Sequence, residues 1–166
     1  MKKENHSKIL KEENSLEIKT LTRLTVTKKG TNEVVKVIES HNIICNEGKK
    51  LITGFLADES AVYDVGITFQ EIGTGTDTPL VGDTTLTAYS ARHALTSAVS
   101  AANVLTSSFF WTAAESPFNI KEAAVWGGSG ANAGEATGLL FAHWLIAFDN
   151  SGTLYDLTFE YILTLP

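Results

Sequence analysis

Residues that could carry chemistry gather in one glycine-rich stretch, residues 67–86 (ITFQEIGTGTDTPLVGDTTL). Gly73 and Gly75 follow a strand pattern as in a dinucleotide-binding turn, but the third glycine of that motif would fall at Thr78. Pro79 then stands where a helix would begin, and no strand–helix–strand unit surrounds the loop. A phosphate-binding loop is also excluded, because the chain contains no Gly-Lys-Ser or Gly-Lys-Thr sequence. The stretch is therefore interpreted as a strand followed by a long ordered loop.

Signals for metal binding and hydrolysis are equally weak. Asp77 and Asp83 offer carboxylates for calcium, but their spacing matches no calcium-binding loop, and turn formation is the alternative role. The four histidines lie far apart, so a zinc site would need distant strands: His6, His41, His93 and His143. No nucleophile-elbow sequence orders a Ser, a His and an Asp. We therefore assign no catalytic, cofactor-binding or metal-ligating residue, and expect a protein that is neither an enzyme nor cofactor-dependent.

Aromatic residues offer a different kind of site, a stacking platform for sugars. The candidates lie on or near predicted strands, where core packing is the alternative: Tyr63, Tyr89, Trp126 and Trp144. If exposed, they would bind a host surface glycan. Three further large rings, Phe109, Phe110 and Trp111, follow one another, which predicts that both faces of their strand are covered.

Charge is distributed unevenly along the chain. Residues 1–50 contain 11 of the 13 Lys and Arg with 7 acids, whereas residues 51–166 contain 2 bases and 12 acids. Nucleic-acid binding does not explain this, because the basic segment alternates Lys with Glu and has no aromatic residue for base stacking. Two interpretations remain: a solvated face, or a basic arm of one copy lying on the acidic body of a neighbour.

Cysteine content and hydropathy limit the cellular setting. The single cysteine, Cys45, excludes an intrachain disulfide and a metal site built from cysteines. The first fifteen residues lack the apolar region of a signal peptide. The longest apolar run, residues 138–148, is about half of what a membrane helix needs. We expect a protein made in the cytoplasm that has no membrane partner.

Alternation of apolar and polar residues predicts an all-β fold. The β-rich runs are residues 17–28, 33–39, 67–72, 88–100, 104–112, 118–126, 139–148 and 153–165. Residues 41–45 either continue the second strand or begin a third. Apolar spacing changes to that of one short helix near residues 47–57, with Asn46 as its cap. This pattern favours a β-sandwich, or a related barrel, of about eight antiparallel strands.

Turn-forming residues predict three hairpins. These join residues 17–28 to 33–39, 88–100 to 104–112, and 139–148 to 153–165. A helix is the alternative for the Ala-rich residues 89–102. The last strand has one wholly apolar or aromatic face, which must point to the core: Tyr155, Leu157, Phe159, Tyr161, Leu163 and Leu165.

The first residues differ in composition from the rest. Residues 1–15 are rich in Lys, Glu, Asn and Ser, which predicts an extended N-terminal arm, and residues 16–166 form a single β-sandwich domain. Such an arm would be ordered by lying on a second subunit or by folding back on its own domain.

Three segments resemble a diffuse group of bacteriophage virion proteins, the tail-fibre or tail structural proteins. Residues 42–56 (NIICNEGKKLITGFL) are similar to the strand, Asn-x-Gly and short helix that open those proteins. Residues 72–86 (IGTGTDTPLVGDTTL) resemble their Gly-Thr-Gly-Thr, Pro, Asp-Thr-x-Leu signature. Residues 120–126 (IKEAAVW), with the Gly-rich loop and terminal strand pair that follow, look like their C-terminal half. Gly82, which lengthens the loop, and the first 40 residues depart from that pattern.

The resemblance implies a structural component of a virion, placed in the tail, the tail tip or a fibre. Its partners would be itself and other virion proteins, in a homo-oligomer, and many-copy assembly would explain the uneven charge. A short domain with an arm equally suits a capsid-decorating head protein. A carbohydrate-binding module for receptor recognition is the second functional class.

Overall fold

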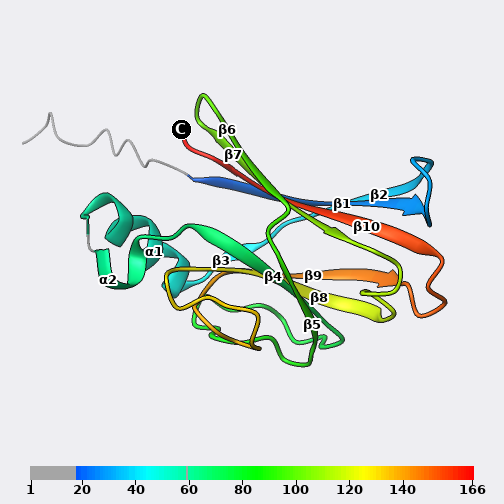
Figure 1. Ribbon diagram of the computed structural model, residues 1–166. Coiled ribbons are helices and arrows are strands. Elements are labelled where there is room, and N and C mark those ends of the chain that lie inside the picture. Colours follow the sequence, from blue (N-terminus) through cyan, green and yellow to red (C-terminus); the bar gives the residue numbers. More distant parts are fainter. Residues whose placement is uncertain (1–17, 59) are drawn as a thin grey trace, which may run out of the picture.

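The computed structural model describes residues 18–58 and 60–166 and consists of two packed antiparallel sheets of five strands each (Figure 1). Sheet A has the order β2 (Val34–Ser40), β1 (Lys19–Lys28), β10 (Tyr155–Thr164), β7 (Val104–Trp111) and β6 (Ser97–Ala101). Sheet B has the order β3 (Ile43–Ile44), β9 (Leu139–Asp149), β8 (Asn119–Gly127), β4 (Ile67–Gly73) and β5 (Tyr89–Ala94). The all-β sandwich prediction is confirmed, with ten strands instead of about eight. The predicted arm, residues 1–15, lies outside the described residues.

The core lies between the two sheets and is dominated by large rings. Trp111 and Trp144 are each about 1% exposed in this core, and Trp126, equally buried, belongs to a second cluster with Leu86 and Leu140. The indole Nε1 of Trp111 on β7 donates to Oε1 of Gln70 on β4 at 2.7 Å, which joins the two sheets through a buried hydrogen bond. Burial of these rings supplies much of the hydrophobic stabilisation of the sandwich.

Strand β10 confirms the predicted alternation over most of its length. Its inward side chains are buried at four alternate positions, which are Leu157, Phe159, Tyr161 and Leu163. Tyr155 is half-buried at the start of the strand. The prediction is wrong for Leu165, which is exposed because it lies beyond the last strand residue and outside the shelter of sheet B.

Phe110 corrects the prediction that both faces of β7 are covered. Phe109 and Trp111 point into the core and are buried, whereas Phe110 is 40% exposed. The outer face of sheet A carries no second layer within the described part of the chain (Figure 1). One large ring therefore stands half-exposed on the outer face of sheet A.

Two of the three predicted hairpins form, and the third does not. Strand β1 pairs with β2, and β6 pairs with β7. Strands β9 and β10 belong to different sheets, so residues 150–154 cross between sheets. Buried Asn150 holds this crossing, because its side chain bonds the backbone N–H and C=O of Tyr155 and its own N–H donates to the carbonyl of Phe118. Its turn residues suit a sheet-to-sheet connection as well as a hairpin.

The predicted strand over residues 88–100 is two strands. Strand β5 lies in sheet B and β6 in sheet A. Between them, Leu95 N–H donates to Thr68 of sheet B, and Thr96 N–H donates to Ser108 of sheet A. The helical alternative for residues 89–102 is wrong, because backbone pairing with both sheets outweighs the helical preference of alanine.

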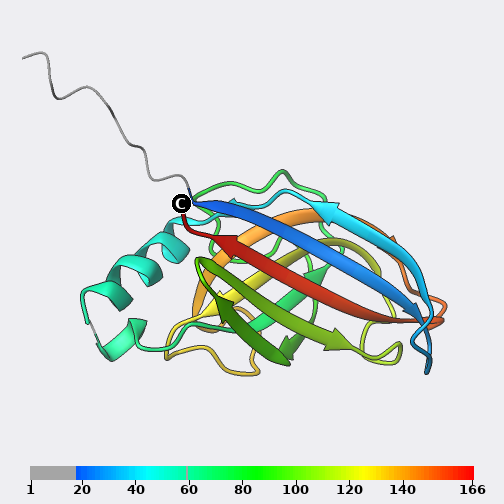
Figure 2. The same cartoon turned by 90° about the horizontal axis from the view of Figure 1, so that it is seen from above.

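Two helices occupy one end of the sandwich, opposite the β1–β2 turn (Figure 2). Helix α1 (Asn46–Leu56) packs on β9, and the shorter α2 (Ser60–Tyr63) follows it. The cap prediction is wrong: Cys45 is the N-cap residue, and Asn46 is already the first helical residue. Residues 41–45 contain the separate strand β3, not a continuation of β2. None of the described helices has the length and apolar character needed to span a membrane.

Candidate functional site

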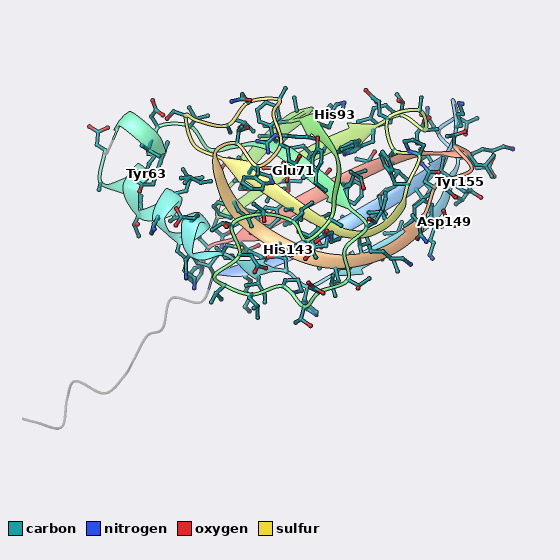
Figure 3. All side chains as sticks on the ribbon, turned by 90° about the horizontal axis from the view of Figure 1, so that it is seen from below. Tyr63, Glu71, His93, His143, Asp149 and Tyr155 are labelled. Carbon is teal, nitrogen blue, oxygen red and sulfur yellow. The ribbon has the colours of Figure 1, made fainter. Side chains whose placement is uncertain are left out.

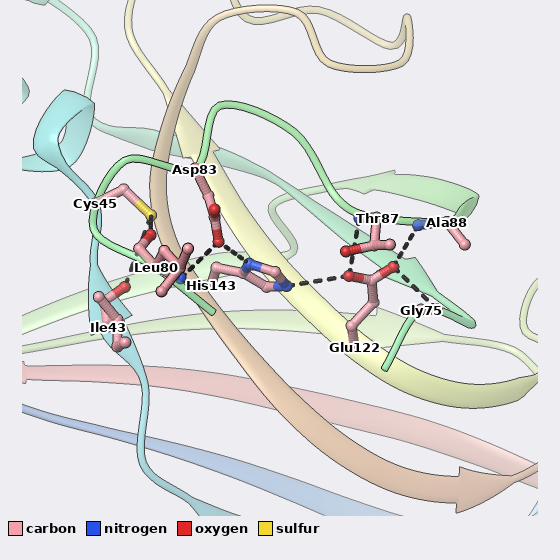
Figure 4. A network of polar contacts seen from close by, with 9 residues as sticks. All are labelled: Ile43, Cys45, Gly75, Leu80, Asp83, Thr87, Ala88, Glu122 and His143. Carbon is pink, nitrogen blue, oxygen red and sulfur yellow. Dashed lines mark hydrogen bonds and ion pairs between the residues drawn. The ribbon is translucent and has the colours of Figure 1, made fainter. Parts of the chain in front are cut away.

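The long loop of residues 74–88 is held down by one buried acid, Glu122 on β8 (Figure 4). Its carboxylate accepts backbone N–H bonds from Gly75 at 3.1 Å, Thr87 at 3.0 Å and Ala88 at 2.7 Å. Both ends of the loop therefore meet at a single side chain. Three N–H donors satisfy the carboxylate oxygens, which compensates for their loss of hydration.

His143 on the neighbouring strand β9 extends this contact into a chain of polar groups. Its Nε2 lies 3.1 Å from Oε2 of Glu122, and its Nδ1 lies 2.8 Å from Oδ2 of Asp83. Asp83 also accepts the N–H of Leu80 at 2.8 Å. The imidazole therefore lies between two carboxylates, with one carboxylate oxygen within hydrogen-bond distance of each ring nitrogen. The centre of the loop is thereby fixed to the sheet.

The Asp83–His143–Glu122 chain contains acid–base groups but holds no nucleophile. Both ring nitrogens of His143 are occupied by carboxylates, and no Ser, Thr or Cys side chain of the described residues bonds to the ring. Cys45 lies near the same loop, where its Sγ is 3.9 Å from the carbonyl of Leu80. Burial, assisted by the charge of Asp83, raises the pKa of the Cys45 thiol to about 12. The thiol therefore stays protonated at neutral pH, and what the polar chain does in the structure is to fix the loop.

The other candidate ligands do not converge. Asp83 is committed to His143 and Leu80, and within residues 18–58 and 60–166 no cluster of three His, Cys, Asp or Glu side chains suits a metal ion. His93 stacks on Trp111, with ring centroids 5.1 Å apart, and its Nε2 faces Glu115 at 3.4 Å. His6 lies outside the described residues.

A second buried pair fixes the glycine-rich loop of residues 128–138. Glu71 on β4 and Arg92 on β5 meet at 2.7 Å, and each side chain is 1% exposed. Arg92 Nη2 donates to the carbonyl of Thr137 at 2.8 Å, and the N–H of Ala136 donates to Glu71 at 2.9 Å. The pair therefore joins two strands and one loop. Figure 3 shows Glu71 and His143 at separate places in the structure.

Burial corrects the predicted sugar platforms. Trp126 and Trp144 are core residues at 1% exposure, and the Arg92 guanidinium lies 5.2 Å from the ring centroid of Trp126. Tyr63 is half-buried, and its ring lies against Gly54 of α1, where an added Cβ would approach within 2.4 Å. Tyr89, the first residue of β5, is also half-buried, so the four candidates do not form an exposed platform. Among the described residues, the aromatic rings with the greatest exposure are Phe55 and Phe110.

Sequence reasoning missed Glu71 and Glu122, which do most to hold the loops. A signal was present: each acid lies inside a strand whose neighbouring residues are apolar, in ITFQEIG and IKEAAVW. An acid in such a run is either on an exposed face or buried with partners. The choice between them depends on the loops that supply the N–H groups, which lie far away in sequence.

The two edges of sheet A are the other unusual surface. All five residues of β6 are exposed, as are the first four residues of β2. On β2 the exposed residues include Val34, Val35 and Val37, at 54%, 46% and 52%. Consecutive exposed valines on an unpaired edge can receive another strand.

Comparison with known protein families, curated proteins and solved structures finds no match for this chain. The described part of the chain has two well-fixed loops on sheet B and two exposed edges on sheet A, of which the β2 edge carries the valines.

Proposed function

We propose that this chain is a structural component of a bacteriophage virion that works by self-assembly, with the β2 edge of sheet A pairing with a second copy. A place in the tail, at its tip or in a fibre follows from the resemblance of residues 42–56, 72–86 and 120–126. The observation that carries the assembly proposal is the exposed valine edge of β2.

The edge of β2 has limited protection against pairing, which consists of a bulge at Val35 and two exposed charges, Lys36 and Glu39. Edge strands of monomeric proteins are shielded by charges, prolines, bulges or covering segments. Here Lys36 is the one charged residue among the four exposed residues at the start of β2. The strand opposite, β3, has only two residues, so β2 extends beyond the cover of sheet B. Pairing with another chain would satisfy its free backbone groups and bury its valines.

Charge favours a second copy as the occupant of this edge. Residues 18–50, which contain β1, β2, β3 and the first five residues of α1, hold seven Lys and Arg against three Glu. Residues 1–17 hold four bases and four acids, so the net positive charge lies in β1, the β1–β2 turn and the start of α1, not in the arm. The remainder of the chain is acidic, with 2 bases and 12 acids. Two copies placed head to tail, with the basic region of one against the acidic region of the other, would attract each other. Two β2 edges that face each other would gain no such attraction.

The two buried ion networks suit this role. They fix the loops of residues 74–88 and 128–138 on sheet B through Glu122 and Glu71. A subunit that repeats many times needs surfaces of constant shape, because a mobile loop loses entropy at every contact. Rigid loops are therefore consistent with an assembly unit.

Disulfide trapping tests the edge contact directly. The one native thiol, Cys45, is buried, so an introduced cysteine reports on its own surroundings. If two β2 edges meet, Val37→Cys forms a disulfide-linked dimer under mild oxidation. If β2 meets β6 of the next copy, the double variant Val37→Cys with Val99→Cys forms a ladder of multimers. Leu154→Cys, at an exposed position between β9 and β10, is the control. The proposal would be contradicted if neither variant forms more disulfide-linked product than the Leu154→Cys control.

The location in a virion needs a separate test. Antibody raised against the purified protein should label particles of the phage that encodes it in immunogold electron microscopy. The position of the gold would distinguish tail from capsid. Intact particles that carry no label, in a lysate where the protein is present, would contradict the virion assignment.

A further inference from the structure

The outer face of sheet A contains a hollow of about 500 Å³ at the end that carries the β1–β2 turn. Strands β1, β7 and β10 and that turn supply its walls, which are Thr27, Gly30, Thr31, Asn32, Phe110, Asp156 and Thr158. The hollow has one exposed aromatic ring, three hydroxyls, one amide and one carboxylate. Neither the edge pairing of β2 nor the two ion networks of sheet B uses this group of residues.

Phe110 supplies the apolar wall of the hollow. Its side chain is 40% exposed, whereas the residues on either side of it in β7, Phe109 and Trp111, are buried in the core. Thr158 of β10 lies directly opposite Phe110 in the strand pairing, so a hydroxyl stands beside the ring on the same face. An exposed ring with an adjacent hydroxyl presents an apolar surface and a hydrogen-bonding group together.

Asp156 supplies a fixed acceptor within the hollow. Its Oδ2 accepts the N–H of Gly30 at 2.8 Å, and its Oδ1 accepts the N–H of Ala113 at 2.8 Å. A carboxylate has about four lone-pair sites, so each oxygen retains one for a further donor. The side chain is held from two directions and is 9% exposed, so it is already oriented before any ligand arrives.

The rim beside Asp156 is fixed in the same way. Thr31 Oγ1 donates to the carbonyl of Lys28 at 2.9 Å and accepts the N–H of Glu33 at 3.2 Å. Thr27 Oγ1 donates to the backbone carbonyl of Asp156 at 3.2 Å. Gly30 has a φ of +68°, a backbone conformation that would be strained in a residue with a side chain. The polar groups around the hollow therefore have set positions.

We propose that this hollow binds one pyranose ring of an oligosaccharide. A pyranose has an apolar C–H face, which would lie on the ring of Phe110, and hydroxyls at its rim, which would bond Asp156 and Thr158. Binding sites of this kind combine an apolar wall with a few well-placed polar groups. A purely apolar ligand would leave the carboxylate of Asp156 buried without a new partner, which is unfavourable. The inference is independent of assembly, because one chain contains the whole hollow.

A printed array of hexose and N-acetylhexosamine oligosaccharides tests the inference. Fluorescently labelled protein should bind at least one member, and Phe110→Ala should reduce that signal at least tenfold. Phe55→Ala is the matched control, since Phe55 is a more exposed phenylalanine on α1, at the other end of the sandwich, and should leave the signal unchanged. Thr158→Val, which keeps the shape of the side chain, should weaken binding without changing the melting temperature.

Two results would overturn the inference. One is the absence of binding to every oligosaccharide on the array by wild-type protein shown to be folded by circular dichroism. The other is binding that Phe110→Ala and Thr158→Val leave unchanged, which would place any sugar site elsewhere on the molecule. Either result would leave the edge-pairing proposal unaffected, because that proposal is judged by cross-linking and mass.

Discussion

Nε2 of His143 lies 3.1 Å from Oε2 of Glu122, and both side chains are buried in sheet B. They stand on adjacent strands, where Ala124 pairs with His143 and Glu122 pairs with Leu145. Through Glu122 the pair holds both ends of the loop of residues 74–88, and through the second ring nitrogen it holds Asp83. The Asp83–His143–Glu122 chain of polar groups thereby holds the loop in a single conformation.

Neutralising Glu122 should therefore destabilise the protein strongly. Glu122→Gln keeps the size of the side chain but removes the negative charge that faces His143 and three backbone N–H groups. Breaking one partner of a buried ion pair costs about 3–5 kcal/mol, so we expect a loss in that range in urea unfolding. Glu135→Gln, at an exposed position, is the control and should change stability by less than about 0.5 kcal/mol. Equal midpoints for both variants would refute the assigned role.

The Glu71–Arg92 pair allows a test by double substitution. Arg92→Met should leave Glu71 buried without its cation and cost about 3–5 kcal/mol. Adding Glu71→Gln should restore part of that loss, because the remaining charge is removed. In both variants we expect faster proteolysis within residues 128–138, because Thr137 loses its bond to Arg92. If the single and double variants unfold at the same urea concentration, the two side chains are not coupled.

Cys45 predicts a dependence of stability on alkaline pH. Folding raises the pKa of its thiol from 9.0 to about 12. The contribution of Cys45 to the free energy of unfolding is therefore fully present below pH 9 and is lost as the pH rises toward 12. Ionisation of one group in the unfolded chain lowers the free energy of unfolding by up to about 1.4 kcal/mol per pH unit. Between pH 9 and 10, Cys45→Ala should therefore show a shallower decline than wild type.

The same thiol gives a chemical readout. Ellman's reagent at pH 8 should leave folded wild-type protein unmodified for hours and react at once in urea. Rapid modification of the folded protein would contradict the buried position of Cys45.

Gly48 allows no side chain, because the first turn of α1 approaches β9 too closely. A Cβ at this position would lie 2.2 Å from the carbonyl oxygen of Phe141. Gly48→Ala should therefore displace the helix and lower the free energy of unfolding by about 1–3 kcal/mol. At Gly82 an added Cβ meets nothing within 4 Å, so Gly82→Ala is the control and should be close to neutral. Equal melting temperatures would contradict the close contact.

Local sequence patterns predicted the strands better than they predicted which strands pair. The alternation in β10 could be predicted from its residues, because one face must be apolar to meet sheet B. The placement of β9 and β10 in different sheets could not be predicted, because Asp149 and Asn150 suit a hairpin and a sheet crossing equally. The break at Leu95 depends on bonds to strands distant in sequence. Glu71 and Glu122 likewise acquire their role from loops that only the folded chain brings to them.

The most direct test of our central claim is the mass of the purified protein in solution, measured by light scattering over a range of protein concentrations. We predict that wild type forms an oligomer, and that Val35→Lys returns it to a single chain, because a second charge beside Lys36 on β2 opposes edge pairing. Leu154→Lys should leave the oligomer intact, and near-molar salt should weaken it. A wild-type protein that remains a single chain at every concentration, or an oligomer that Val35→Lys does not change, would contradict assembly through this edge.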